Sequence, residues 1–341
     1  MKKTVSFSKN ATNVFFHILT GCNLSCRHCY INPVQHGTKP LSLETIVSWL
    51  KQFSDNAQQA NVIFLGGEPT LHPALPQAVR AARAMGYASV TIDTNGYLFN
   101  DILSKLTPDE VDFFSFSLDG ATRQTNDRIR GDGSYDTCLA GIRNAADRGF
   151  HTSLIYTVSH GNLREVEQMP PLLKNLGIQR FFIQVIGIRG KSAQTGAAGS
   201  DQEKRQLSAK EWLETIPAVA DAVARLGITA IYPKVFLRPE ELFACAGIEA
   251  ENYFIFPNGR VYRCPLCEDF PFHSLAFKEN QLMSMPKVNE ADLFPLIIPE
   301  GCVMNKIIQP GNIQYASDGT PAYKIACCML KEEIRYRGQR A

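Results

Sequence analysis

The stretch NVFFHILTGCNLSCRHCY, Asn13 to Tyr30, joins an apolar run to three closely spaced cysteines. The run NVFFHIL is rich in β-branched and aromatic residues, which predicts a buried β-strand. Cys22, Cys26 and Cys29 follow directly after the end of that strand. If the ten cysteines were placed at random in the chain, this particular spacing would occur with an expectation of about 0.01, so it needs a chemical reason.

Five further apolar runs follow the first and alternate with stretches of helical period. They are NVIFL (61–65), SVTID (89–93), DFFSFSL (112–118), TSLIYTV (152–158) and RFFIQVI (180–186). Most are nearly continuous in hydrophobicity, as is typical of parallel strands covered on both faces. Between the first two, residues 42–54 predict a helix that Ser42 can cap. Six βα units are too few for a closed eight-stranded barrel, so we expect an α/β fold, a partial (β/α)6 TIM-like barrel, with ligands at the carboxyl ends of its strands.

A polar, Gly/Ala/Ser-rich stretch over residues 187–206 marks a change of character along the chain. We therefore expect a core domain over residues 1–190, a linker and helix over 191–227, and a small cysteine-rich domain over 228–341. The capping box Ser208-Ala209-Lys210-Glu211 predicts where that helix begins. Six of the ten cysteines lie in the last segment, which also contains a predicted hairpin at Pro257-Asn258-Gly259. So irregular a segment is expected to rely on metal for its fold.

The overall charge gives no sign of a nucleic-acid or membrane partner. The chain has 35 basic and 33 acidic residues and no Lys/Arg run, so the expected partner is a small molecule or a peptide. The sequence before Cys22 is too interrupted by polar residues for a lipoprotein signal, and no run of eighteen apolar residues could span a bilayer. Without an export signal the protein is expected to be cytoplasmic, where thiols stay reduced, so metal explains the cysteines better than disulfides.

The three N-terminal cysteines are compatible with two kinds of metal centre. Structural zinc usually takes four ligands in paired units, and only three thiols are present here. Three thiolates on a cubane of four irons and four sulfurs leave one iron open to a substrate or cofactor. The spacing therefore favours an iron–sulfur cluster over zinc.

The spacing C-x₃-C-x₂-C resembles the signature of the radical S-adenosylmethionine (radical SAM) superfamily, and other motifs agree in order. LGGEP (65–69), TNG (94–96), SLDG (117–120) and NDRIRG (126–131) resemble runs of that family at successive strand ends. The resemblance implies a [4Fe-4S] cluster held by Cys22, Cys26 and Cys29. It also implies that S-adenosylmethionine is bound by His28, Gly66, Gly67, Glu68, Asn95, Ser117, Asp119 and Arg130. In this interpretation Glu68 pairs with the ammonium of the cofactor and Arg130 with its carboxylate, whereas Asp119 could equally be a turn residue.

The C-terminal cysteines resemble a second family pattern. Cys245, Gly259 and Cys264 fit the start shared by the SPASM and twitch extensions of radical SAM enzymes, but the full SPASM continuation is absent. The resemblance implies a twitch-like domain with an auxiliary [4Fe-4S] cluster. Its implied ligands are Cys245, Cys264, Cys267 and Cys302, with Cys327 or Cys328 as alternatives for the fourth. A structural zinc site or a second unusual site stays open.

The resemblance implies an enzyme that reductively cleaves S-adenosylmethionine to a 5′-deoxyadenosyl radical. That radical would take hydrogen from a peptide or small molecule and give an oxidised, cross-linked or rearranged product. Flavodoxin or ferredoxin is the expected electron donor. The alternatives are molybdopterin-type or sugar chemistry and, from another class, a non-catalytic iron–sulfur carrier or structural metal-binding protein. No catalytic acid or base stands out, and Cys138 is expected in the core, because it lies on an apolar helical stripe.

Overall fold

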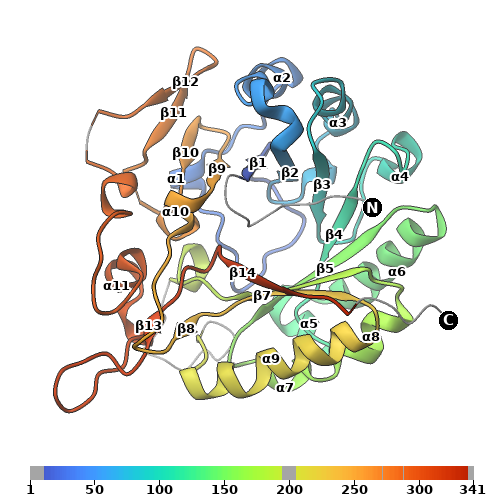
Figure 1. The fold of residues 1–341 in the computed structure, drawn as a ribbon. Coiled ribbons are helices and arrows are strands. Elements are labelled where there is room, and N and C mark those ends of the chain that lie inside the picture. Colours follow the sequence, from blue (N-terminus) through green and yellow to red (C-terminus); the bar gives the residue numbers. More distant parts are fainter. Residues whose placement is uncertain (1–10, 194–204, 271, 287, 337–341) are drawn as a thin grey trace.

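A curved parallel sheet forms the centre of the molecule, with helices along its outer side (Figure 1). This computed structural model describes residues 11–193, 205–270, 272–286 and 288–336. The parallel strands are β1 (Thr12–His17), β2 (Ala60–Leu65), β3 (Ser89–Thr94), β4 (Phe113–Ser117), β5 (Thr152–Val158), β6 (Arg180–Val185) and β7 (Thr229–Pro233). The six expected strands and the α/β class are confirmed, and β7 adds one strand that the apolar pattern did not predict.

Two of the longer helices, α2 and α9, begin at capping residues that the sequence predicted. Ser42 Oγ accepts a hydrogen bond from Thr45 N at 3.1 Å, and Ser208 and Glu211 form the expected capping box. The helices are α1 (Pro33–His36), α2 (Leu43–Lys51), α3 (Leu75–Ala84), α4 (Ile102–Lys105), α5 (Arg123–Arg130), α6 (Ser134–Asp147), α7 (Leu163–Val166), α8 (Met169–Asn175), α9 (Ala209–Arg225), α10 (Ala246–Glu249) and α11 (Val303–Ile308). Among the described residues, no helix is both long and apolar enough to cross a membrane.

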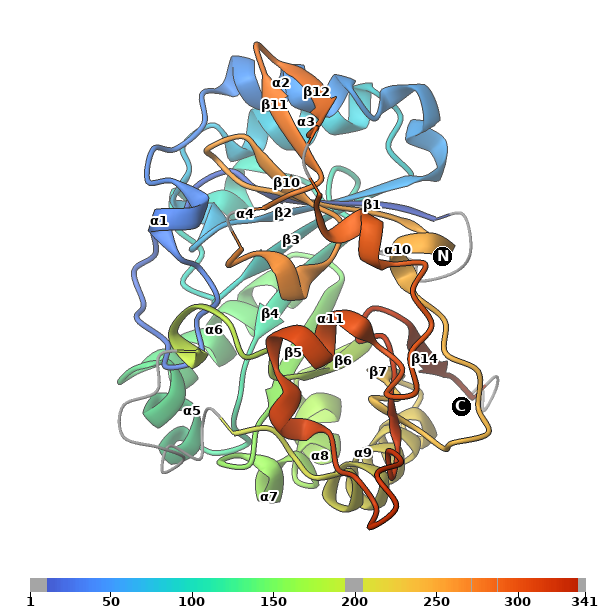
Figure 2. The same cartoon turned by 90° about the vertical axis from the view of Figure 1, so that its left-hand side faces the viewer.

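The C-terminal segment continues the same sheet. Strand β9 (Glu251–Ile255) pairs in parallel with β1, and β10 (Arg260–Tyr262), β11 (Leu275–Lys278) and β12 (Gln281–Ser284) follow as antiparallel strands. At the other end β14 (Lys331–Ile334) pairs antiparallel with β7, and β8 (Phe236–Leu237) pairs with β13 (Lys324–Ile325) in a small separate sheet. The C-terminal segments, orange to red in Figure 2, lie across the face of the barrel turned to the viewer.

The two faces of the central strands differ in chemistry because side chains alternate along a strand. Phe16, Phe64 and Phe114 are fully buried, and Phe16 stacks on Trp49 of α2 with ring centroids 6.0 Å apart. The alternate positions line a cavity inside the barrel and include Phe15, Ile63, Asp93, Ser115, Ile155 and Gln184. The helix-facing surface supplies the apolar core, and the inner surface carries polar groups.

Buried asparagines fix the register at the start of the strands. Asn13 Nδ2 donates to Asn252 Oδ1 at 2.9 Å, and Asn61 Nδ2 donates to Asn13 Oδ1 at 3.2 Å. Ser89 Oγ donates to Asn61 Oδ1 at 2.7 Å. Because a slip of one residue would break this chain of bonds across β9, β1, β2 and β3, it specifies their alignment.

Candidate active site

The loop that carries Cys22, Cys26 and Cys29 leaves the carboxyl end of β1 and lines the cavity of the barrel. Four neighbouring segments hold it. Arg27 N donates to Ile129 O at 2.9 Å, Asn95 Nδ2 donates to Asn23 Oδ1 at 2.8 Å, and Lys191 N donates to Cys29 O at 2.8 Å. Held in this way, the three thiols share one end of the cavity without forming a disulfide.

The glycines after β2 belong to the fourth segment that holds the cysteine loop. Gly67 N donates to Leu19 O at 3.1 Å and Glu68 N donates to Gly21 O at 3.0 Å. A Cβ at Gly66 would lie 2.7 Å from Leu19 O, and one at Gly67 would lie 2.5 Å from Thr20 O. The resemblance implies that these glycines contact the cofactor, and the structure gives them a packing task as well. They let the end of β2 pack backbone to backbone against the cysteine loop.

Glu68 is fully buried and held by its neighbours. Its Oε1 accepts from Thr70 Oγ1 at 2.6 Å and from Thr94 Oγ1 at 2.9 Å, and its Oε2 accepts from Asn95 N at 2.8 Å. Burial raises the pKa of Glu68, while these hydrogen bonds act in the opposite direction. The carboxyl therefore has a fixed orientation at the cavity wall, beside the thiols.

Asp119 lies behind the cavity and acts through two residues that line it. Its Oδ2 is 2.6 Å from Arg130 Nε and 3.2 Å from His28 Nε2, and its Oδ1 accepts from Thr157 N at 2.8 Å. Burial alone would raise its pKa, but the charges of Arg130 and His28 outweigh burial and lower the pKa to about 2. Asp119 is fully buried and absent from the lining, and it orients Arg130 and His28. Its expected contact with the cofactor stays a prediction.

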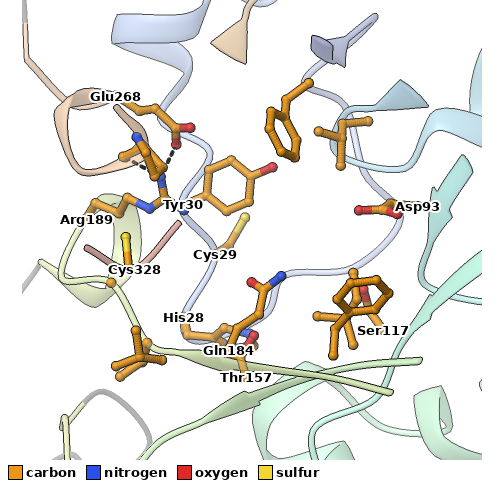
Figure 3. Close-up of a pocket in the computed structure, with 18 of the residues that line it drawn as sticks. His28, Cys29, Tyr30, Asp93, Ser117, Thr157, Gln184, Arg189, Glu268 and Cys328 are labelled. Atoms are coloured by element: carbon orange, nitrogen blue, oxygen red, sulfur yellow. Dashed lines mark hydrogen bonds and ion pairs between the residues drawn. The ribbon is translucent and has the colours of Figure 1, made fainter. Parts of the chain in front are cut away.

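The cavity measures about 320 Å³ and connects the cysteine loop to the C-terminal segment. Of the expected cofactor residues, it is lined by His28, Gly66, Gly67, Glu68, Asn95, Ser117 and Arg130. Figure 3 shows Asp93 on one side of this view and Arg189 on the other, with Cys29 between them. The structure thus brings together all but one of the residues expected to bind the nucleotide.

Comparisons with known proteins identify the family to which the barrel region is similar. Residues 16–169 match the model of the radical SAM superfamily. These residues form a radical SAM domain, and this match together with the relatives named as enzymes supports a radical SAM enzyme. It is 29% identical to Fe-coproporphyrin III synthase of Methanosarcina barkeri over 65% of this chain and 54% of that protein. It is 32% identical to a probable GTP 3′,8-cyclase of Saccharolobus islandicus over 48% of this chain and 53% of that protein. The chain thus spans about half the length of these curated relatives.

Solved radical SAM structures share the fold. Streptococcus suis SuiB superposes with a TM-score of 0.62 at 14% identity, over 84% of this chain and 66% of that chain. The protein anSMEcpe with bound AdoMet superposes with a TM-score of 0.63 at 13% identity, over 88% of both chains. At such identities the likeness supports the partial barrel and says nothing of the substrate.

The residues present fit the cofactors that radical SAM proteins use. Three thiols at one end of a cavity match a cluster with one open iron. Nδ1 of His28 is buried without a hydrogen-bond partner among the described residues, so it offers a polar atom to a bound nucleotide. No three metal-binding side chains in the described part of the chain converge on a point that a single ion could occupy.

The C-terminal cysteines gather from separate segments into one group. The thiols of Cys245 and Cys327 share a hydrogen bond, and so do those of Cys264 and Cys267. Cys302 and Cys328 each interact electrostatically with Cys327 and Cys264. Residues far apart in sequence therefore meet at one place. The hydrogen bond to Cys245 makes Cys327 as good a candidate as Cys302 for the fourth ligand of the expected auxiliary cluster.

The cavity also contains ionisable residues that sequence reasoning did not find. Burial raises the pKa of Asp93 to about 7 and lowers that of Lys331 to about 8, and the two charges interact across the barrel. A group whose pKa lies near 7 can accept or donate a proton at neutral pH. The Asp in the apolar run SVTID could have indicated such a residue in the sequence, because burying a carboxylate in a strand is costly unless it has a partner or a function.

Proposed function

We propose that this protein reductively cleaves S-adenosylmethionine and uses the resulting 5′-deoxyadenosyl radical to abstract hydrogen from a peptide or a small molecule. The observation that carries the proposal is the cavity shared by Cys22, Cys26 and Cys29 and the expected nucleotide-binding residues. A carrier that only stores electrons has no need of such a chamber. The bound cluster and nucleotide would supply the one-electron chemistry.

The residues of the chain would bind and orient the nucleotide. Arg130 is held by Asp119 with its guanidinium at the cavity wall, so it can bind a carboxylate with two parallel hydrogen bonds. Glu68 offers a fixed acceptor to an ammonium group. His28 and Ser117 lie further along the wall, where ribose and adenine would extend. Asp93 is the group best placed to take or give a proton, since it lines the same cavity.

The substrate would occupy the rest of the cavity, toward the C-terminal segment. Phe15 and Phe254 stack there with ring centroids 4.5 Å apart, and Phe182 adds to the apolar wall. The peptide alternative is supported by structural neighbours such as SuiB bound to its precursor peptide SuiA. The small-molecule alternative is supported by the curated relatives.

The C-terminal cysteines are proposed to hold an auxiliary [4Fe-4S] cluster. Cys245, Cys264 and Cys267 would be ligands, with Cys302 or Cys327 as the fourth. Flavodoxin or ferredoxin is the proposed electron donor. Thiols that must stay reduced to bind iron fit a reducing compartment such as the cytoplasm.

The test is anaerobic reconstitution with iron and sulfide, followed by dithionite and S-adenosylmethionine. Formation of 5′-deoxyadenosine, measured by liquid chromatography and mass spectrometry, is expected from the wild type. A variant with Cys22, Cys26 and Cys29 replaced by alanine should form none. A fully reconstituted wild type that leaves S-adenosylmethionine intact would favour the carrier instead.

A further inference from the structure

Arg189 lies between the two groups of cysteines. Its guanidinium carbon is 4.6 Å from the centroid of the Tyr30 ring, and Tyr30 directly follows Cys29. On the other side Nη1 forms an ion pair with Glu268 and donates a hydrogen bond to Pro265 O. Pro265 directly follows Cys264 and Glu268 directly follows Cys267 in the chain, and Arg189 and Glu268 are seen together in Figure 3.

The backbone around Arg189 is fixed by the cysteine loop. A Cβ at Gly190 would lie 2.5 Å from Cys29 O and 2.6 Å from Tyr30 Cα, and Gly190 has a positive φ of 57°. Lys191 N donates to Cys29 O at 2.8 Å. The side chain of Arg189 is only 19% exposed. Its charge is therefore held in one place, as a preorganised electrostatic group must be.

The charge of Arg189 acts on the auxiliary thiols. Burial lowers the pKa of Arg189, but the negative charge of Glu268 outweighs burial and raises it. The sulfurs of Cys264 and Cys328 also lie within range of the guanidinium charge. By reciprocity, the guanidinium stabilises negative charge at Cys264 and Cys328. Adding an electron to a metal group held by these thiols adds negative charge, which a neighbouring cation favours.

We propose that Arg189 is a positioning residue that raises the reduction potential of the metal group held by the Cys264 set. The proposal rests on the auxiliary cluster proposed above. It gives the Arg189–Glu268 pair a second purpose besides joining the segment after β6 to the C-terminal segment. It also predicts effects of opposite sign for the two partners, which a purely structural ion pair would not produce.

The test measures the midpoint potential of the auxiliary cluster alone, by a redox titration followed by electron paramagnetic resonance. The background variant has Cys22, Cys26 and Cys29 replaced by alanine, so that only the C-terminal site binds iron. In this background Arg189→Gln should make the potential more negative, by at least a tenfold change in equilibrium constant, or about 59 mV for one electron. Glu268→Gln should make it more positive, and the double variant should fall between them.

Two further variants separate charge from structure. Arg189→Lys keeps the positive charge, so the midpoint potential of the auxiliary cluster should stay close to its value in the background variant. Arg180→Gln is the matched control, because Arg180 also lies over an aromatic ring, 5.5 Å from the centroid of Phe113, and pairs with Glu333. Its substitution should leave the potential unchanged.

The outcomes are distinct. If Arg189→Gln and Glu268→Gln bind full iron but neither shifts the potential, the inference is wrong and the proposed function stands. If the background variant binds no iron, the auxiliary site fails and this inference fails with it. If Arg189→Gln alone loses iron, a positive shift in Glu268→Gln supports the proposal and an unchanged potential overturns it.

Discussion

Replacing Gly67 by alanine should release the N-terminal cysteine loop. The new methyl group would lie 2.5 Å from Thr20 O and closer still to Gly21 O. Carbon atoms of this kind essentially never come within 3.0 Å of such a neighbour, and Gly21 O would lie at 2.2 Å, so the backbone must retreat by at least about 0.8 Å. Because both contacts are with backbone, no side chain can rotate away to relieve them.

The expected loss of stability follows from the contacts that this backbone shift would break. The bonds from Gly67 N to Leu19 O and from Glu68 N to Gly21 O would both weaken, at about 1 kcal/mol each. Overpacking adds about 1 to 3 kcal/mol. The expected loss of about 3 to 5 kcal/mol is a large part of the stability of an ordinary domain, which is about 5 to 15 kcal/mol.

The assay is iron content after anaerobic reconstitution, with thermal unfolding of the apoprotein beside it. Gly67→Ala should lose about four irons per chain and unfold at a lower temperature. Gly311→Ala is the control, because a Cβ at Gly311 meets no atom within 4 Å. If Gly67→Ala kept its iron and unfolding temperature and lost only nucleotide binding, the close approach would serve the cofactor and our reasoning would be refuted.

Three other outcomes are expected. Burial lowers the pKa of His17 to about 3 and that of His36 to about 4. As the pH falls below about 6.5, the unfolded chain therefore binds protons that the folded chain does not. Each histidine then lowers the free energy of unfolding by about 1.4 kcal/mol per pH unit. His17→Asn should remove about half of this dependence of the unfolding free energy on pH, measured by urea titrations at pH 4.5 to 6.5. Asp119→Asn should destabilise the apoprotein by about 3 kcal/mol or more in the same titration, because Arg130 loses its buried counter-charge. Replacing Cys22, Cys26 and Cys29 by alanine should leave about four irons per chain; near-zero iron would refute an auxiliary cluster.

A matched variant makes the Asp119→Asn test specific. Asp132 is exposed, and Asp132→Asn should leave the stability unchanged. An equal slope in His17→Asn and the wild type would mean that His17 is protonated in the folded state, contrary to its burial.

Local patterns predicted the core well. The runs from NVFFHIL to RFFIQVI became β1 to β6, because buried parallel strands must be apolar whatever their partners. The caps at Ser42 and Ser208 were predictable because they satisfy nearby backbone donors. Cys138 lies in the core as expected, 1% exposed. The Asn258-Gly259 turn formed between β9 and β10, with Gly259 at a positive φ of 85°.

Long-range pairings were beyond such patterns. The run ENYFI could have paired with any strand, and nothing local shows that it lies beside β1, 239 residues earlier. The role of Asp119 was equally hidden, because a carboxylate that binds a ribose and one that holds Arg130 and His28 have the same sequence motif. The SLDG motif predicted that these residues lie near the site, but only the packing shows that Ser117 lines the cavity and Asp119 does not.

The pairing of β1 with β9 has a consequence for how the protein is made. During synthesis β1 can find β2 early, but its other edge stays without a partner until residue 255 leaves the ribosome. At about 5 to 20 residues per second, that delay is on the order of 10 to 50 s. For that time the nascent chain carries an open, apolar strand edge, which is the kind of surface that aggregates or recruits a chaperone. Expression at lower temperature or with added chaperones should therefore raise the soluble yield of the full-length chain.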